Sequence, residues 1–187
     1  MILAAGASRR LGRPKQMERL GPETLLERAV RVAGEARQGT VYVVVNATDA
    51  PVLGEARRLG CEVVLNHEAE EGIAASIRAG LRAIGDDPTS VLVMTCDQPA
   101  VSPEHLRALA EGAEGDEVVA SAYAGRRGVP ACFPWRVVGV LLGLQGDVGA
   151  RDLLRGARAI DLPNGELDLD TEEELDRARG LFVAGTI

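Results

Sequence analysis

The sequence predicts an α/β protein with three layers, in which helices cover both faces of a mainly parallel, twisted β-sheet. Two observations predict this class. Runs rich in β-branched residues alternate with helical patterns almost throughout the 187 residues. Two of the runs, at 62–65 and 90–95, are continuously apolar, which is typical of strands buried on both faces. The length suits one core, so we expect a single domain over residues 1–187.

Four strands and two amphipathic helices form the expected framework. The strands lie at 40–45 (TVYVVV), 62–65 (EVVL), 90–95 (SVLVMT) and 117–123 (EVVASAY). Helical spacing predicts that one helix packs on the sheet through Leu25, Leu26, Ala29, Val30 and Ala33. A second would pack through Ile73, Ile77, Gly80, Leu81 and Ile84.

Two further helices are indicated by their first residues. Ser102 is a favourable N-cap with Pro103 behind it, and this helix should run to about Leu109. The last helix should begin after Thr171, where three consecutive glutamates favour the positive end of the helix dipole. No repeat or low-complexity linker divides the chain.

The overall charge argues against a nucleic-acid partner. The formal net charge is −7, so the average field repels polyanions, and aromatic residues for base stacking make up only 3% of the chain. Any phosphate site must therefore be local, built from particular cationic side chains and backbone N–H groups. A small phosphorylated ligand fits this composition.

Cysteine usage and hydropathy predict a cytoplasmic protein. Cys61, Cys96 and Cys132 are odd in number and widely spaced, which indicates neither a disulfide framework nor a structural zinc site. No apolar run reaches the roughly 18 residues of a membrane span, and no signal-peptide core follows Met1. We expect no membrane partner.

The N-terminal loop has the composition of a polyphosphate site. After a short β-like start, residues 4–15 combine small residues and two glycines with three arginines and Lys15. Small residues allow backbone N–H groups to approach phosphates, and the cations neutralise them. The loop is neither a Walker A loop nor G-x-G-x-x-G. On composition alone, a flexible basic surface loop is an equally good interpretation.

Acidic residues mark two further segments. Asp97 follows the buried run at 90–95, so it should lie at the carboxyl end of the sheet, where α/β proteins bind ligands. Asp168 and Asp170 are two residues apart, so in an extended segment both project from one face and can share a cation. The structural alternatives are a turn residue at Asp97 and an acidic helix start at Asp170 or Thr171.

The run LAAGASRRLGRPKQ resembles the signature of the molybdenum cofactor nucleotidyltransferases, specifically of their cytidylyltransferase-like branch. The resemblance extends from Leu3 to Leu175 and implies a Rossmann-like fold of the nucleotide-diphospho-sugar transferase type. The matching positions are Leu3, Ala4, Ala5, Gly6, Ser8, Arg10 or its neighbour Arg9, Gly12 and Lys15. It implies that this loop binds the triphosphate and that Lys15, Arg10 and Asp97 are catalytic. Only Met1 and Ile2 precede the loop, so the first strand is short or begins upstream.

The same resemblance implies a metal site. The string Cys96-Asp97-Gln98-Pro99 is similar to the branch's metal motif, in which the aspartate binds Mg²⁺ or Mn²⁺. The stretch from Asp168 is similar to the family's late acidic motif, although Glu172 stands where proline is usual. By this match Asp170 is the better second ligand and Asp168 the weaker one. We interpret Cys96 as a packing residue.

Two further sets of residues are implied by the resemblance. Asn66, Gly72 and Ser76 correspond to nucleoside contacts, although a turn glycine and a helix serine explain the last two equally well. Arg127, Gly128, Pro130 and Arg151 correspond to the acceptor side, where a guanidinium suits a phosphate. The alternative there is two surface turns. His67 and His105 are given no catalytic role, and Phe133 and Trp135 are expected in the core.

The expected reaction is transfer of CMP from CTP to the phosphate of molybdopterin, with or without its molybdenum, and release of pyrophosphate. Alternatives are GTP or another NTP as donor, or a sugar or alditol phosphate as acceptor. Ala5, where the guanylyl branch tends to have glycine, favours CTP. A different class of protein is a non-catalytic chaperone for the molybdenum cofactor. A molybdenum hydroxylase is the partner that such a protein would serve.

Overall fold

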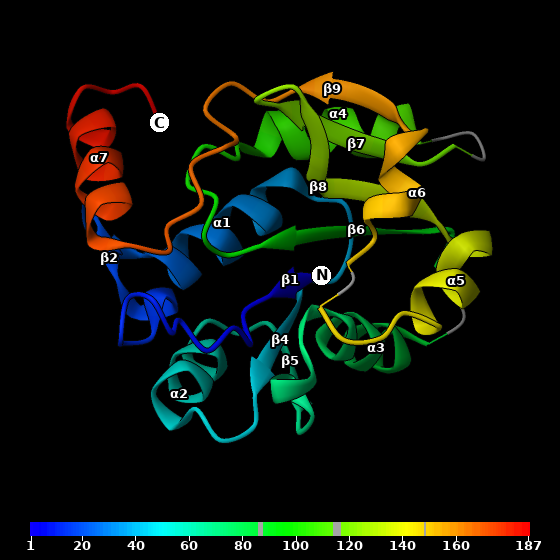
Figure 1. The fold of residues 1–187 in the computed structure, drawn as a ribbon, viewed down its shortest axis with the longest axis horizontal. Helices are drawn as coiled ribbons and strands as arrows, with labels where there is room; N and C mark the ends of the chain where they lie inside the picture. Colours follow the sequence, from blue (N-terminus) through cyan, green and yellow to red (C-terminus); the bar gives the residue numbers. More distant parts are fainter. Residues whose placement is uncertain (86–87, 114–116, 148) are drawn as a thin grey trace.

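A seven-stranded twisted sheet lies at the centre of the computed structural model, which describes residues 1–85, 88–113, 117–147 and 149–187 (Figure 1). The strand order is β5-β4-β1-β6-β8-β7-β9. Only β8, which lies between β6 and β7, runs antiparallel to its neighbours. The strands are β1 (Ile2–Leu3), β4 (Tyr42–Asn46), β5 (Glu62–Asn66), β6 (Ser90–Thr95), β7 (Val119–Tyr123), β8 (Arg126–Pro134) and β9 (Arg158–Asp161). The expected mainly parallel sheet is confirmed.

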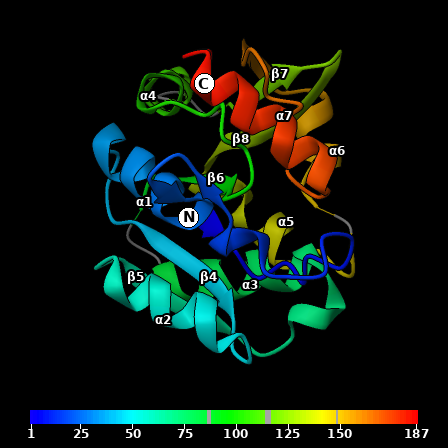
Figure 2. The same cartoon turned by 90° about the vertical axis from the view of Figure 1, so that its left-hand side faces the viewer.

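Helices cover both faces of this sheet, as expected for three layers. One apolar cluster joins β1, β4 and β6 to α1 (Leu25–Ala36), α2 (Ala50–Arg58) and α4 (Pro103–Gly112). A second cluster joins the other face to α3 (Ile73–Ile84), α5 (Val138–Leu142) and α6 (Arg151–Arg155). Figure 2 shows α1, α2 and α4 on one side of the sheet and α3, α5 and α6 on the opposite side.

The C-terminal helix α7 (Glu172–Val183) packs outside this sandwich, beside the short hairpin of β2 (Arg19–Leu20) and β3 (Glu23–Thr24). Leu20 and Leu25 meet Leu169, Leu175 and Ala178 in a third buried cluster. Thr171 caps α7 through the backbone N–H of Glu174, whose carboxylate accepts from Thr171 in return. This packing holds the acidic segment before α7 against the N-terminal part of the chain.

Several expectations need correction. The run at 62–65 is the edge strand β5, so it has no neighbour on one side, and Leu65 is 40% exposed rather than buried. Ile73 is the first residue of α3, and it is 36% exposed instead of packing on the sheet. Trp135 is only partly buried, whereas Phe133 is fully buried. The α4 helix, capped by Ser102 as expected, continues to Gly112.

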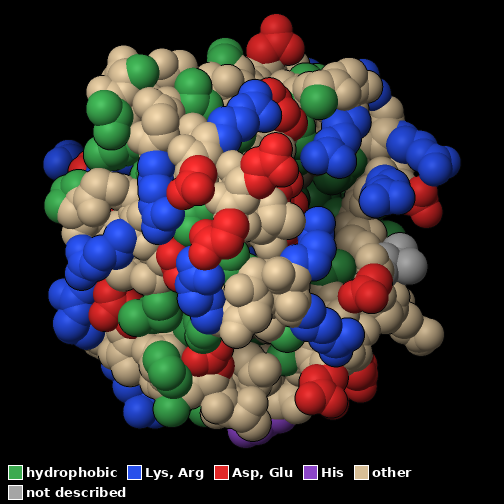
Figure 3. All heavy atoms as spheres, turned by 60° about the vertical axis from the view of Figure 1, so that its left-hand side comes forward, with side chains coloured by type: hydrophobic (Ala, Val, Ile, Leu, Met, Phe, Trp, Pro, Cys, Tyr) green, Lys and Arg blue, Asp and Glu red, His purple; other side chains and the backbone are tan. Residues whose placement is uncertain are grey.

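The surface facing the viewer in Figure 3 carries Lys and Arg side chains interspersed with Asp and Glu, without a broad patch of one sign. Among the described residues, no helix is long and apolar enough to cross a bilayer.

Candidate active site

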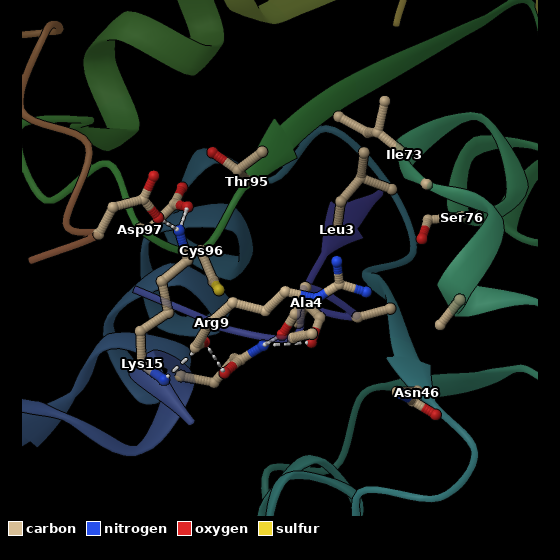
Figure 4. Close-up of a pocket in the computed structure, with 18 of the residues that line it drawn as sticks. Leu3, Ala4, Arg9, Lys15, Asn46, Ile73, Ser76, Thr95, Cys96 and Asp97 are labelled. Atoms are coloured by element: carbon tan, nitrogen blue, oxygen red, sulfur yellow. Dashed lines mark hydrogen bonds and ion pairs between the residues drawn. The ribbon is translucent and has the colours of Figure 1, made fainter. Parts of the chain in front are cut away.

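The carboxyl ends of β1, β4 and β6 open into a pocket of about 540 Å³, called the first pocket below. This is the edge at which parallel sheets bind ligands. Most of the residues singled out from the sequence line it, namely Leu3, Ala4, Ala5, Gly6, Ser8, Arg9, Arg10, Lys15, Gly72, Ser76, Asp97 and Asp170. Figure 4 shows Lys15 and Asp97 pointing toward one another, with Asn46 and Ser76 on the opposite side. The structure thus brings the N-terminal loop and the acidic residues into one site.

A buried glutamine fixes the shape of the N-terminal loop. The side chain of Gln16 is 1% exposed, and its Nε2 donates to the carbonyl oxygens of Ala4 at 2.8 Å and Gly6 at 2.9 Å. The backbone N–H of Lys15 donates to Ser8 Oγ at 3.0 Å. These bonds hold the start and end of the loop together, so the backbone from which the Lys15 side chain extends is fixed. Sequence reasoning missed Gln16, although it directly follows Lys15.

Lys15, which is the only lysine in the chain, lies among three carboxylates. Its Nζ contacts Asp97 Oδ2, lies 2.5 Å from Asp170 Oδ1 and lies 3.6 Å from Asp168 Oδ1. Only 11% of its side chain is exposed. A buried ammonium needs such partners, because an unpaired charge away from water is costly. The N-terminal loop, the end of β6 and the segment before α7 therefore meet at one nitrogen atom.

The charges of this group perturb one another. Burial lowers the pKa of Lys15, but the attraction and hydrogen bond to Asp97, together with the attraction to Asp168, outweigh it, so the pKa lies above its ordinary value. Burial alone would raise the pKa of Asp97, but the Lys15 ammonium holds it below its ordinary value. Loss of water around Asp168, together with the neighbouring Asp97 carboxylate, raises the pKa of Asp168 to about 6. Asp97 is therefore a stronger acid than an ordinary aspartate, and Asp168 is a weaker one.

The carboxylates fit a divalent cation. Single oxygens of Asp97, Asp168 and Asp170 all lie within 4.8 Å of one another. Asp97 Oδ1 is buried and has no hydrogen-bond partner among the described residues. An unsatisfied buried oxygen is costly, and a cation would satisfy it. Three carboxylates with one ammonium keep a net negative charge, and oxygen ligands of this kind suit Mg²⁺ and Mn²⁺.

The arginines of the loop point in different directions. Arg10, which the family pattern favours, pairs with Asp170 and has a side chain that is 68% exposed. Arg9 lies across the first pocket between the Lys15–Asp97 pair and Ser76 (Figure 4), and it forms no ion pair with any described residue. Arg13 bridges Glu18 on the hairpin side and Glu172 at the start of α7. The loop thus has one cation free to meet an anion in the pocket.

The opposite end of the first pocket is lined by Asn46, Gly72, Ser76 and Asp147. Asn66 lies behind this wall, 2% exposed, and donates to Ser76 Oγ at 3.0 Å, so it positions Ser76. Gly72 has a φ of 108°, and a Cβ there would lie 2.7 Å from the Gly146 carbonyl oxygen. Sequence reasoning missed Asn46, whose signal was its place directly after an apolar strand.

A second pocket, of about 1140 Å³, lies beside β7, β8 and α6. Arg127, Gly128 and Arg151 line it, together with Arg126 and Arg155. Pro130 is buried behind it, and its carbonyl oxygen accepts a 2.6 Å hydrogen bond from Ser121. Ile73 lines both pockets, so the two adjoin at the start of α3. Between them runs the segment from Gly146 to Arg151, of which Val148 lies outside the described residues.

Comparison with known sequences agrees with this geometry. Residues 1–162 match the model of the MobA-like NTP transferase domain. The chain is 31% identical to the purine catabolism protein PucB of Bacillus subtilis, with 96% of this chain and 94% of PucB covered. It is 30% identical to the nicotine blue oxidoreductase of Paenarthrobacter nicotinovorans, covering 95% and 94%. It is 34% identical to a probable molybdenum cofactor guanylyltransferase of Pelotomaculum thermopropionicum, covering 63% and 54%.

Solved structures share the fold over almost the whole chain. A nucleotidyl transferase from Methanothermobacter thermautotrophicus superposes with a TM-score of 0.85 at 26% identity, covering 98% of this chain and 96% of that one. Rv0371c of Mycobacterium tuberculosis, solved as a complex with manganese, gives a TM-score of 0.76 at 26% identity, covering 96% of each. The chain is therefore a nucleotidyltransferase, and it belongs to the MobA-like NTP transferase family.

Proposed function

We propose that this enzyme transfers CMP from CTP to the terminal phosphate of molybdopterin, or of its molybdenum-loaded form, and releases pyrophosphate. The observation that carries the proposal is the meeting of Lys15 with Asp97 and Asp170 in the lining of the first pocket, with Asp168 next to them. A cation from the N-terminal loop next to a group of carboxylates suits the handling of a triphosphate with its metal ion.

The reaction needs positioning more than acid–base chemistry. An oxygen of the acceptor phosphate forms a bond to the α-phosphorus of CTP as the bond from that phosphorus to the bridging oxygen breaks. The electron pair of the broken bond leaves with pyrophosphate. The acceptor oxygen is already anionic, so no strong general base is required. Lys15, Arg10, Arg9 and the loop N–H groups would stabilise the charge on the phosphates.

Asp97, Asp170 and Asp168 are the proposed ligands of Mg²⁺ or Mn²⁺. When bound, the ion would neutralise phosphate charge and orient the triphosphate. The unsatisfied Asp97 Oδ1 supports this assignment, and so does the manganese complex of Rv0371c. Asp97 is the primary ligand, because it is the most buried and stays ionised beside Lys15.

The nucleoside is assigned to the far end of the first pocket. Leu3, Ala4, Ala5, Gly6 and Ser8 would contact the nucleotide through the loop backbone, with Gly72 and Ser76 facing them. Asn66 would act by holding Ser76. The choice of CTP over GTP rests on Ala5 and on the string Cys96-Asp97-Gln98-Pro99. GTP, the donor that one relative's name implies, is the alternative.

The acceptor is assigned to the second pocket. Arg127 and Arg151 supply guanidinium groups for a phosphorylated acceptor, and Gly128 lines the pocket beside them. Pro130 supports the wall from behind. The two pockets adjoin at Ile73, which supports an acceptor in the second pocket beside a nucleotide in the first. A molybdenum hydroxylase is the proposed recipient of the product.

The test is a pyrophosphate-release assay with each of the four NTPs, with and without molybdopterin. We expect CTP to be the one NTP that gives release, and we expect that release to require molybdopterin. At a metal concentration that half-saturates the wild type, Asp97→Asn should lower the signal strongly, whereas Asp176→Asn, a matched change on the exposed face of α7, should not. If GTP were the one NTP that gave release, the donor would be GTP and not CTP. Molybdopterin-independent rates with every NTP would refute the acceptor.

A further inference from the structure

The side chain of Gln98, next to the proposed metal ligand Asp97, is turned away from the carboxylates and buried in the protein. It is 8% exposed. Its Nε2 lies 3.0 Å from the Val129 carbonyl oxygen, 3.3 Å from the Gly165 carbonyl oxygen and 3.3 Å from the Tyr123 hydroxyl. Its Oε1 accepts from Thr95 Oγ1 at 3.2 Å. The amide is therefore bonded at both of its ends.

These partners come from three separate parts of the chain. Val129 belongs to β8, Tyr123 ends β7, and Gly165 lies in the segment that leads from β9 to the acidic residues. One carboxamide thus connects the turn after β6 to the hairpin beside it and to the segment before α7. Only a donor can make these contacts, because two of the three partners are carbonyl oxygens.

The attachment at Gly165 lies just before Asp168. A second attachment lies just after it, where the backbone N–H of Leu169 donates to the Asp97 carbonyl oxygen at 3.3 Å. Asp168 is therefore held between two bonds to the Asp97–Gln98 turn. One of those bonds is made by the Gln98 side chain, so the position of Asp168 relative to Asp97 depends on it.

We propose that Gln98 is a positioning residue that sets the spacing of the metal carboxylates by fixing the Gly165–Leu169 segment against the Asp97 turn. It does not touch the metal or the substrate. The inference rests on the metal site of the proposed function. Residues that orient metal ligands from outside the coordination sphere typically affect metal affinity by about 10–100-fold.

The test is a titration of the metal-depleted protein with Mn²⁺ alone, with free Mn²⁺ measured by electron paramagnetic resonance. Gln98→Met removes both hydrogen-bonding ends at similar length and unchanged charge. We expect its dissociation constant for Mn²⁺ to rise about 10-fold. Gln38→Met is the matched control, because Gln38 is exposed and donates only to the nearby Ala36 carbonyl oxygen, and it should bind Mn²⁺ like the wild type.

A double-mutant cycle separates positioning from general loss of structure. If Gln98 acts through Asp168, then Gln98→Met should change Mn²⁺ affinity by less than about threefold in an Asp168→Asn background. Wild-type affinity in Gln98→Met, or the full loss repeated in the Asp168→Asn background, would overturn the inference. Gln98→Asn, whose shorter carboxamide cannot reach both carbonyls, carries the same expectation if Gln98→Met does not melt cooperatively. A wild-type protein that binds no Mn²⁺ would instead overturn the proposed metal site itself.

Discussion

Lys15 and Asp170 form a 2.5 Å contact between Nζ and Oδ1, although 155 residues separate them. One belongs to the loop after the first strand, and the other immediately precedes the last helix. The packing of α7 on Leu20 and Leu25 is what brings them together. The proposed site therefore needs both ends of the described chain.

Replacing Lys15 should stop the reaction while preserving the fold. Lys15→Ala removes the cation that we assign to the α-phosphate, and we expect kcat to fall by about 100-fold or more. The variant should still melt cooperatively, since the hydrophobic clusters are untouched. Arg177→Ala, on the exposed face of α7, serves as the control. A wild-type kcat in Lys15→Ala would contradict the role of this residue.

Replacing Asp97 should change metal dependence more than nucleotide binding. Asp97→Asn keeps the shape of the side chain but loses the charge that we assign to metal binding. We expect the Mg²⁺ or Mn²⁺ concentration for half-maximal activity to rise about 10-fold or more. The measurement is a metal titration of the rate, in parallel with Asp176→Asn. An unchanged metal requirement would remove Asp97 from the ligand set.

Asp168 should make the metal-free protein less stable at neutral pH. Its pKa of about 6 in the folded protein lies above its ordinary value of 3.8, so the folded state binds the proton more tightly. The free energy of unfolding therefore falls as the pH rises from about 3.8 to about 6. Above this range the loss of stability caused by the ionised Asp168 is complete. Asp168→Asn cannot ionise and escapes the penalty.

In buffer with a chelator at about pH 7.5, we expect Asp168→Asn to melt about 2–4 °C above the wild type, the shift that about 1 kcal/mol makes in a chain of this size. The carboxylate is half exposed, and screening keeps the effect small. The difference should shrink at about pH 4.5, where most of the wild-type carboxyl is protonated. A lower melting temperature for the variant at both pH values would show that Asp168 stabilises the fold through another interaction.

Acceptor binding should depend on the second pocket alone. Arg151→Ala removes a guanidinium next to the proposed acceptor phosphate, and a hydrogen bond to a charged group contributes about 1.5–3 kcal/mol. We expect KM for molybdopterin to rise at least about 10-fold, with KM for CTP unchanged. Arg127→Ala should behave similarly. Equal increases in both KM values would place these arginines at the nucleotide instead.

The sheet core could be predicted because its strands are apolar and uninterrupted. The run 90–95 is β6 without a change of bounds, and its acidic successor Asp97 lies in the first pocket as expected. In contrast, β8 is not among the expected strands, because Arg126, Arg127, Gly128 and Pro130 interrupt any alternation of apolar and polar residues. Pairing with β6 and β7, which the local sequence does not encode, makes this segment a strand.

The lining of the first pocket was predictable where a single residue type dictates the chemistry, as with Lys15 and Asp97. Supporting residues were not, because their role depends on what lies opposite them in space. Gln16 bonds to the loop that precedes it, and Gln98 bonds to chain segments more than 25 residues away. Asn66 was expected in the pocket but lies behind Ser76, because its amide is used within the protein.

The presence of one lysine among 20 arginines makes the proposed catalytic cation chemically addressable. Arginine does not react with aldehydes and activated esters as an amine does, so a reagent specific for the ε-amino group has one side-chain target, which reacts slowly because its ammonium is buried and held protonated by carboxylates. Protection of that position by a nucleotide would report occupancy of the pocket directly, without any need to know the acceptor.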